Sequence, residues 1–426
     1  MAKPNCLVFP DNGDWIVFAP VSRLALRVNA RAAEQFRIFV DRGRPGDAGA
    51  RGSSSVQTKD FRPTCVAIYT SNQCSQQCVY CYGFPSRRSH AQLDLQFCRA
   101  AFELVAREVS QLKAVFDVYF TGTGEPTFNW PLFTHCVQLV QDVKQMHSIP
   151  TRLTLCTGGQ VNTAQADWIA QNLDDVNISL DGPSDIQNQQ RPRSDGSDSL
   201  AGPLRLAKAV QSRGRKLQIK CTVTRASVKR MTEIVEFIAR EIGPVELEFE
   251  MMFNLPWISS ARAESPVVRE FVEQFGDALD AGARLKVRVR HQAVNLGKLA
   301  RDPCAPSRDY LTLAPPNIIT AFHDLPQELD FNPTLGAYGW YDKATDSIRF
   351  DHEKRRRLHE GQELTELTQC RECPCWAVCS GQGAVKSRLM GDSAALEPIC
   401  EVRIGILQEL LRRKVCRQID LEEKSL

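Results

Sequence analysis

The chain has 426 residues, of which 43% are hydrophobic and 24% are charged. This composition excludes a disordered or fibrous protein and is typical of a globular chain long enough for one large domain and a smaller one. Cysteine makes up 16 of the 426 residues, which is far below the ~8–10% of a disulfide-built secreted scaffold. The 53 basic and 50 acidic side chains nearly balance, which argues against a nucleic-acid partner.

The N-terminal segment MAKPNCLVFPDNGDW lacks the basic start and the apolar run of a signal peptide, so we expect a cytoplasmic protein. No apolar run reaches the roughly 18 residues that mark a membrane helix, so we expect no membrane partner. In a reducing compartment, clustered cysteines are expected to bind metal or take part in redox chemistry rather than to form disulfides.

Residues 1–60 contain the strand-like runs CLVF, WIVFA and LALRV, a helix near 29–40, and a Gly-, Ser- and Arg-rich segment near 43–60 that is typical of a flexible linker. Between 61 and 283, apolar β-rich runs alternate with amphipathic helices, which indicates a parallel sheet with helical crossovers. The expected strands are residues 65–71, 116–122, 152–158, 176–182, 217–224 and 245–251. The expected helices lie near 92–111, 131–146, 163–172, 199–213, 227–241 and 264–283.

Because the strand candidates are nearly continuous in apolar residues, we expect them to be covered on both faces. They fit an α/β fold that is either a partial (β/α)6 TIM-like barrel or a doubly wound sheet, and in both the chemistry lies at the C-terminal ends of the strands. Residues 284–426 lose the alternation and contain prolines, the short runs YLTL, NIITAF and SIRFD, and more cysteines. We expect a separate, loop-rich domain held partly by metal and closed by a helix near 401–416.

The sharpest motif is a set of three cysteines in the loop after the first barrel strand, Cys74, Cys78 and Cys81. Three thiolates at this spacing can hold three irons of a 4Fe–4S cluster and leave the fourth iron open for a ligand. An open position is the mark of a catalytic rather than a structural metal site. A zinc knuckle is the alternative interpretation.

Two further segments follow strand ends. The second strand ends in Thr121-Gly122-Thr123-Gly124-Glu125-Pro126, and the fourth in Ser179-Leu180-Asp181-Gly182-Pro183, with Arg191 downstream. With Tyr80 directly before the third cysteine, these segments resemble the radical S-adenosylmethionine (AdoMet) superfamily, in its peptide-modifying branch. Ordinary turns and a surface arginine are the alternative.

The resemblance implies the residues that bind the cofactor. Its glycine-rich segment brings backbone groups to the amino group of AdoMet, and glycines permit a close approach because they carry no Cβ. The serine at the fourth strand end and the later arginine bind the ribose or the carboxylate, for which a guanidinium fork is suited. The cofactor-binding candidates are therefore Tyr80, Gly122, Thr123, Gly124, Glu125, Ser179, Asp181 and Arg191.

The second cysteine set, Cys370, Cys373, Cys379 and Cys400, resembles the SPASM domain, a C-terminal extension that usually carries two auxiliary 4Fe–4S clusters. Gly383 stands where that pattern has a further cysteine, and only Cys304 lies upstream. We therefore predict one auxiliary 4Fe–4S cluster on the four cysteines, with zinc as the open alternative. Cys375 could replace one ligand or be a packed thiol.

The other cysteines, residues 6, 65, 98, 136, 156, 221 and 416, lie singly on strands or helices and are expected to be small core side chains, although a metal-ligand role for Cys416 stays open. His323 and Asp324 are adjacent in a segment where the resembled enzymes place a residue that transfers a proton, so they are the candidate acid and base. A surface histidine is the alternative.

The resemblance implies reductive cleavage of AdoMet to methionine and a 5′-deoxyadenosyl radical, with the electron supplied by a flavodoxin or ferredoxin. The leading hypothesis is a radical enzyme that modifies a peptide or protein, such as a precursor peptide, with cross-link formation as one outcome. The alternatives are a radical enzyme that acts on RNA or a small metabolite, and a nonenzymatic iron–sulfur protein.

Overall fold

The computed structural model describes residues 7–19, 24–41, 61–81, 83, 90–253, 263–292, 294, 296, 310–321, 336–360, 373, 375, 378, 379 and 396–423. The whole expected linker near 43–60 lies outside these residues, as do Cys304, Cys370, His323 and Asp324. No helix within the described part of the chain is long and apolar enough to cross a membrane.

The core of the molecule is a curved sheet of eleven strands in the order β10-β9-β8-β7-β6-β5-β4-β11-β12-β13-β14. In this order, every neighbouring pair from β10 through β4 to β11 is parallel. The pairs β11–β12, β12–β13 and β13–β14 are antiparallel. The six strands expected from the sequence are confirmed as β4 (Cys65–Ile68), β5 (Phe116–Phe120), β6 (Thr151–Thr157), β7 (Asp175–Ser179), β8 (Lys216–Val223) and β9 (Glu246–Met251).

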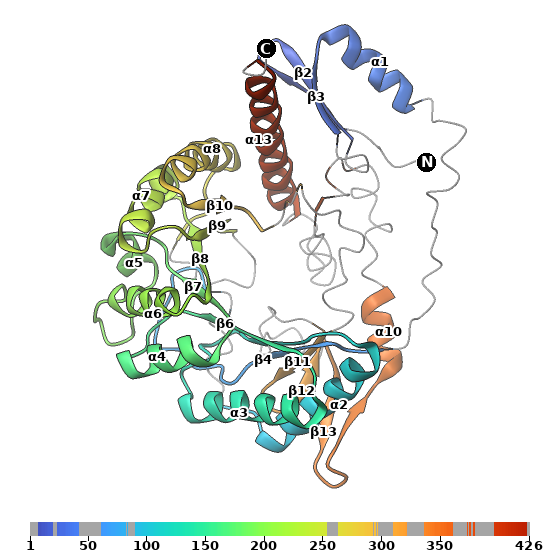
Figure 1. The fold of residues 1–426 in the computed structure, drawn as a ribbon, viewed down its shortest axis with the longest axis vertical. Helices are drawn as coiled ribbons and strands as arrows, with labels where there is room; N and C mark the ends of the chain where they lie inside the picture. Colours follow the sequence, from blue (N-terminus) through green and yellow to red (C-terminus); the bar gives the residue numbers. More distant parts are fainter. Residues whose placement is uncertain are drawn as a thin grey trace.

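Helices cover the outer face of this curved sheet (Figure 1). They are α2 (Leu95–Leu112), α3 (Trp130–His147), α4 (Thr163–Asn172), α5 (Ser184–Gln190), α6 (Ala201–Ser212), α7 (Met231–Glu241), preceded by the 3-10 turn η3 (Val228–Arg230), and α8 (Val268–Leu285). Short α5 has no counterpart among the expected helices. The sheet has two free ends in its strand order, so the partial barrel of parallel strands is confirmed and a doubly wound sheet, with helices on both faces, is not observed.

Along β8 the face opposite the helices is polar, which corrects for this strand the expectation of burial on both faces, whereas all four residues of β4 are buried. Along β8, the buried Leu217, Ile219 and Val223 alternate with the half-buried Lys220 and Thr222. Successive side chains of a strand point to opposite faces, so one face packs against the helices and the other lines the inside of the partial barrel. Cys221 occupies one of the buried positions of this alternation.

The helix ends are encoded by local sequence. Helix α4 begins at a capping box in which the Asn162 side chain accepts from the Gln165 backbone N–H while the Gln165 side chain accepts from the Asn162 N–H. Helix α2 begins after Asp94, whose carboxylate accepts from the Gln96 N–H at 2.9 Å. Helix α4 thus begins soon after the end of β6, whereas α2 begins only after the loop of the three cysteines that follows β4.

The rest of the chain adds strands to both ends of the sheet. After residue 283, β10 (Arg288–Arg290) pairs with β9, and β11 (Tyr310–Ala314) pairs with β4 and continues into β12 (Ile318–Thr320), β13 (Ala337–Asp342) and β14 (Ser347–Phe350). Helix α10 (His352–Glu360) follows. The division of the chain at residue 283 stays a prediction, and the sheet is continuous across it.

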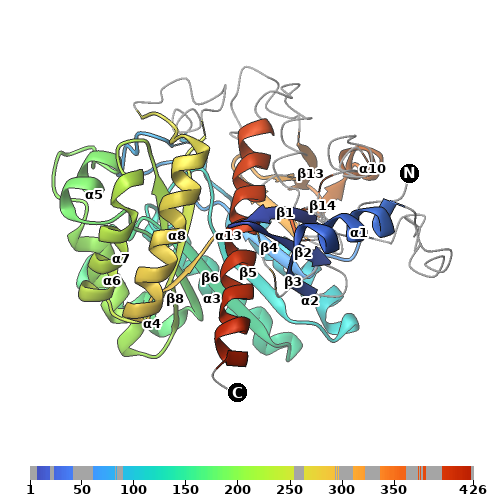
Figure 2. The same cartoon turned by 90° about the horizontal axis from the view of Figure 1, so that it is seen from above.

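The N-terminal segment forms a small antiparallel sheet of β1 (Leu7–Asp11), β2 (Asp14–Ala19) and β3 (Leu24–Val28), followed by α1 (Ala30–Asp41). The C-terminal helix α13 (Leu396–Glu423) extends beyond the expected range at both ends. It lies between α8 and this small sheet and contacts both (Figure 2).

Candidate functional site

The three cysteines lie in the loop that follows β4, at the C-terminal edge of the parallel strands. Backbone hydrogen bonds fix this loop to the segment after α5: the Gln77 N–H donates to Pro192 O at 2.7 Å, and the Val79 N–H donates to Gln190 O at 3.0 Å. Cys74, Cys78 and Cys81 are half-buried and form no disulfide. The loop is therefore held in place by its backbone, and its thiols keep some access to solvent.

The spacing of the thiols bears on the kind of metal. Among the described residues, no group of three or more His, Cys, Asp or Glu side chains is arranged to hold a metal ion. The ligands of a zinc ion converge on one point, whereas a 4Fe–4S cluster takes each thiolate on a different iron. The choice between a zinc ion and a 4Fe–4S cluster on Cys74, Cys78 and Cys81 stays a prediction from the motif.

The glycine-rich turn after β5 is packed against the backbone that leads into the cysteines. A Cβ on Gly124 would lie 2.3 Å from Ser71 O and 2.6 Å from the carbonyl carbon of Asn72. Gly122 has φ +140°, and a Cβ there would lie 2.7 Å from the Tyr69 ring. In this structure, glycine is therefore required at both positions because other atoms of the protein lie against them. Contact of this backbone with a cofactor stays a prediction.

Glu125 ties this turn to the loop after β6. Its buried carboxylate accepts from Thr127 Oγ1 and Thr157 Oγ1, each at 2.7 Å, from the Gly158 N–H at 2.7 Å and from the Thr127 N–H at 3.1 Å. Thr123 is also buried, and its hydroxyl donates to the Asn72 side chain at 3.2 Å. Through these hydrogen bonds, Glu125 and Thr123 stabilise the shape of the turn.

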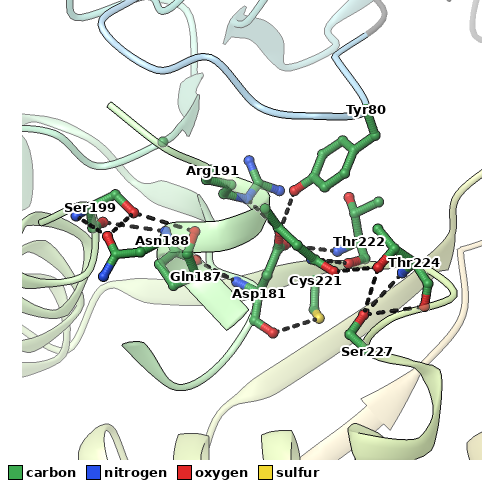
Figure 3. A network of polar contacts seen from close by, with 12 residues as sticks. Tyr80, Asp181, Gln187, Asn188, Arg191, Ser199, Cys221, Thr222, Thr224 and Ser227 are labelled. Carbon is green, nitrogen blue, oxygen red and sulfur yellow. Dashed lines mark hydrogen bonds and ion pairs between the residues drawn. The ribbon is translucent and has the colours of Figure 1, made fainter. Parts of the chain in front are cut away.

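Asp181, at the end of β7, is the centre of a buried polar network (Figure 3). Its carboxylate accepts from the Tyr80 hydroxyl, from Gln190 Nε2 at 2.8 Å and from the Thr222 N–H at 3.0 Å. Its backbone N–H donates to Gln187 Oε1 at 2.8 Å. Burial raises the pKa of Tyr80 well above its usual value, and the negative charge of Asp181 raises it further. The phenol is therefore a hydrogen-bond donor at neutral pH.

Arg191 extends the network toward the cysteines. Its side chain is 9% exposed, and its Nε lies 3.0 Å from Asp181 Oδ2. Burial alone would lower the pKa of Arg191, but the charge of Asp181 outweighs it and raises that pKa. The guanidinium carbon lies 5.2 Å from the centroid of the Tyr80 ring. Its terminal nitrogens form no hydrogen bond within the described residues, so this buried cation can accept a carboxylate or another anion.

A cavity of about 460 Å³ opens beside the cysteine loop. Val79 of that loop, Gln190 and Thr224 line it, and the ion pair of Arg225 with Glu264, 2.7 Å, stands at its wall. The volume falls in the range of about 300–1,000 Å³ that is usual for small-molecule sites. Val79 follows Cys78 in the chain, so the cavity borders the loop that carries the three thiols.

Ser179 ends β7 and lies in register with Lys220 of β8, which is in register with Glu248 of β9. Lys220 Nζ lies 3.2 Å from Glu248 Oε1, and Arg290 lies 2.9 Å from Glu248 Oε2. Burial alone would lower the pKa of Lys220, but Glu250 and Glu248 raise it. The inner wall of the barrel thus carries charged groups. Period-two alternation within β8 and β9 is the signal that could have identified them.

Three described cysteines of the second set lie near one another. Cys373 and Cys379 are half-buried, and Cys400 is on α13. Burial raises the pKa of Cys400, and the charges of Cys373 and Cys379 add to that effect. Arg403 NH1 donates to Cys379 Sγ at 3.2 Å. Cys370 lies outside the described residues, so the four-ligand set stays a prediction.

Cys375 is 1% exposed and lies between these thiols. A hydrogen bond with Cys373, together with burial, raises its pKa. Its backbone oxygen accepts from the N–H groups of Val378 and Cys379 at 2.9 and 2.8 Å. These contacts are those of a packed thiol that shapes the turn between Cys373 and Cys379. Cys65, Cys98, Cys136 and Cys221 are buried as expected of core side chains, and Cys156 is half-buried.

No protein-family model matches the chain. The cysteine-type anaerobic sulfatase-maturating enzyme of Clostridium perfringens is 22% identical over 170 residues, which are 39% of this chain and 46% of that protein. The chain thus matches less than half the length of this relative.

Solved structures match over more of the chain. The structure of native anSMEcpe with bound AdoMet covers 82% of this chain and 98% of its own, at 15% identity and a TM-score of 0.58. SuiB of Streptococcus suis bound to the precursor peptide SuiA covers 93% of this chain and 97% of its own, at 13% identity and a TM-score of 0.50. The chain has the α/β fold of the radical AdoMet maturases, and the resemblance inferred from its motifs is confirmed at the level of the fold.

Proposed function

We propose that this chain is a radical AdoMet enzyme that modifies a peptide or protein. The observation that carries the proposal is the joint position of the three-cysteine loop and the buried Arg191 at the C-terminal edge of the parallel strands. Cys74, Cys78 and Cys81 would hold three irons of a 4Fe–4S cluster, leaving one coordination position for AdoMet. When bound, these groups supply reductive cleavage of the sulfonium to methionine and a 5′-deoxyadenosyl radical that removes a hydrogen atom from the substrate.

The chain's own residues bind and orient the cofactor in this proposal. The Arg191 guanidinium, with its terminal nitrogens directed away from Asp181, would bind the AdoMet carboxylate. Ser179 and the backbone of Gly122 to Gly124 would contact the ribose and the amino group. The cavity beside Val79 and Thr224 would take part of the ligand and exclude water from it. Glu125 and Thr123 would hold the glycine-rich turn rather than touch the ligand.

A peptide or protein substrate is supported by the structures that share the fold. The structure of anSMEcpe with AdoMet and the Cp18Cys peptide covers 80% of this chain at a TM-score of 0.54 and 14% identity, and SuiB is bound to its precursor peptide. We propose a peptide or protein, such as a precursor peptide, as the substrate of this chain as well. A flavodoxin or ferredoxin would supply the electron, and one auxiliary 4Fe–4S cluster would lie on Cys370, Cys373, Cys379 and Cys400.

The activity is tested by anaerobic reconstitution with iron and sulfide, followed by assay for 5′-deoxyadenosine in the presence of AdoMet and a strong reductant. The wild type is expected to form the product. A variant with Cys74, Cys78 and Cys81 changed to Ala is expected to form none, because the cluster that binds AdoMet has lost its ligands. A wild type that contains iron and sulfide but forms no 5′-deoxyadenosine would contradict the enzymatic proposal.

The substrate class is tested by coexpression with a short peptide encoded beside this chain and by mass spectrometry of that peptide. A loss of two hydrogens, or another fixed mass change, is expected with the wild type and absent with the triple cysteine variant. An unchanged mass under conditions where 5′-deoxyadenosine forms would count against that peptide as the substrate.

A further inference from the structure

One buried carboxylate connects three parts of the proposed site. Asp181 has no exposed surface, and it accepts from Tyr80 in the cysteine loop, from Gln190 at the end of α5 and from the Thr222 N–H on β8. It also forms the ion pair with Arg191 (Figure 3). The loop, the helix end and two strand ends therefore share a single acceptor group.

The hydrogen bond from Tyr80 to Asp181 acts on the cysteine loop because of where Tyr80 lies in the chain. Tyr80 lies between Cys78 and Cys81, so a bond to its hydroxyl acts on the part of the loop that carries two of the three thiols. Asp181 is fixed in turn, because its other carboxylate oxygen accepts from the Thr222 backbone and its own N–H donates to Gln187. The hydroxyl thus ties the loop to the rigid ends of β7 and β8.

We infer that Asp181 is a positioning residue that holds the cysteine loop and the Arg191 guanidinium as one unit, so that both can bind the same AdoMet molecule. The inference rests on the proposed function for the identity of the ligand. It assigns the Tyr80 hydroxyl a role separate from that of the Tyr80 ring, which faces Arg191. It also gives Asp181 a different role from the one expected from the sequence: instead of contacting the cofactor, Asp181 acts through Tyr80 and Arg191.

A carboxylate is the side chain that this position requires. Arg191 is buried, and a buried cation without a counterion is strongly destabilising. The same group must also accept from a phenol and from an amide, which a carboxylate can do with its two oxygens. An apolar residue would satisfy neither demand, and an amide would leave the charge of Arg191 unbalanced.

The first test removes only the hydroxyl. In the reconstituted full-length Tyr80→Phe protein without AdoMet, we expect amide hydrogens of residues 74–81 to exchange about tenfold faster than in the wild type, because a hydrogen bond to a charged acceptor is lost. The matched control is Tyr341→Phe, which removes a tyrosine–aspartate bond of 2.6 Å to Asp346 elsewhere in the fold. Its exchange at residues 74–81 is expected to equal that of the wild type.

The second test measures coupling between the two residues. The dissociation constant of AdoMet, followed by the change it causes in the EPR signal of the reduced cluster, is expected to rise about tenfold in Tyr80→Phe and further in Asp181→Asn. Because the hydroxyl acts through Asp181, the double variant should bind AdoMet no more weakly than Asp181→Asn alone. Losses that add in the double variant would overturn the inference.

The outcomes separate this inference from the proposed function. Wild type that binds AdoMet and forms 5′-deoxyadenosine, together with Tyr80→Phe that exchanges and binds as the wild type does, would overturn the positioning role alone. Wild type that fails to form 5′-deoxyadenosine would contradict the proposed function, while faster exchange of residues 74–81 in Tyr80→Phe would still support the positioning of the loop. If Asp181→Asn does not fold, Tyr80→Phe and its control decide the matter.

Discussion

At the scale of single residues, the structure distinguishes side chains that face a ligand from those that hold the site. Arg191 and Ser179 remain candidates to contact AdoMet, because one is a buried cation with terminal nitrogens that form no described hydrogen bond and the other ends a strand on the inner wall. Asp181 and Glu125 direct their carboxylates to protein donors. Motif spacing does not reveal this difference, since it depends on which donors the fold brings near each carboxylate.

The second cysteine set gives a prediction at the same scale. In a background with Cys74, Cys78 and Cys81 changed to Ala, the protein is expected to retain about four irons, the content of one closed cluster. Cys375→Ala should keep this iron, because the Cys375 thiol is buried, and the backbone oxygen that accepts from the N–H groups of Val378 and Cys379 is unchanged in the variant. Cys379→Ala should lose it. Iron and sulfide analysis measures the difference, and zinc in the background protein, or loss of iron in Cys375→Ala, would contradict the ligand set.

At the scale of elements, the long periodic segments were predictable and the short ones were not. The six strands β4 to β9 were found because apolar runs alternate with helical segments along the chain, and the motifs at their ends predicted where the site would be. Strand β10 has three residues, Arg288–Arg290, two of them charged, and α5 has seven; neither is long enough for a period to show. The Asp181 network joins residues up to 101 positions apart, which local pattern cannot indicate.

The glycine-rich turn gives a prediction at this scale. Gly124→Ala places a Cβ against the backbone of Ser71 and Asn72, which cannot rotate away as a side chain could. We expect a loss of about 1–3 kcal/mol in the free energy of unfolding, as for other overpacked sites, and less iron bound after reconstitution because Ser71 and Asn72 lead into the cysteine loop. Urea denaturation and iron analysis measure the two effects.

The control for this prediction is Gly276→Ala in α8, where the added Cβ would meet the end of the flexible Glu409 side chain. Because Ala favours a helix over Gly by up to about 1 kcal/mol, the stability of this variant should change little or rise. A Gly124→Ala protein as stable and as rich in iron as the wild type would contradict the prediction, because it would show that the turn accommodates the added Cβ.

At the scale of the whole molecule, the small N-terminal sheet packs against the C-terminal helix. The C-terminal helix α13 contacts α8 on one side and β2 and β3 on the other, so it joins the small N-terminal sheet to the barrel (Figure 2). It also carries Cys400 of the second cysteine set, and Arg403, which donates to Cys379. The strands of the N-terminal sheet were predicted from their sequence runs. Their contact with a helix some 400 residues later could not be, because contacting pairs such as Asp11 and Arg412 consist of residue types that occur throughout the chain.

One buried acid contributes to that contact. Asp11, 6% exposed, forms ion pairs with Arg27 of β3 and with Arg412 of α13, the latter at 3.0 Å. Asp11→Asn removes the charge that both guanidinium groups face. Because those arginines keep partial access to solvent, we expect a cost of about 1–2 kcal/mol, below that of a fully buried pair. Opening of the contact should appear as hydrogen exchange in β1 to β3 that is about tenfold faster, with β4 to β9 unchanged. Asp14→Asn, at the other end of the same turn, is the control, and equal exchange in the two variants would show that the Asp11 ion pairs do not hold the N-terminal sheet on α13.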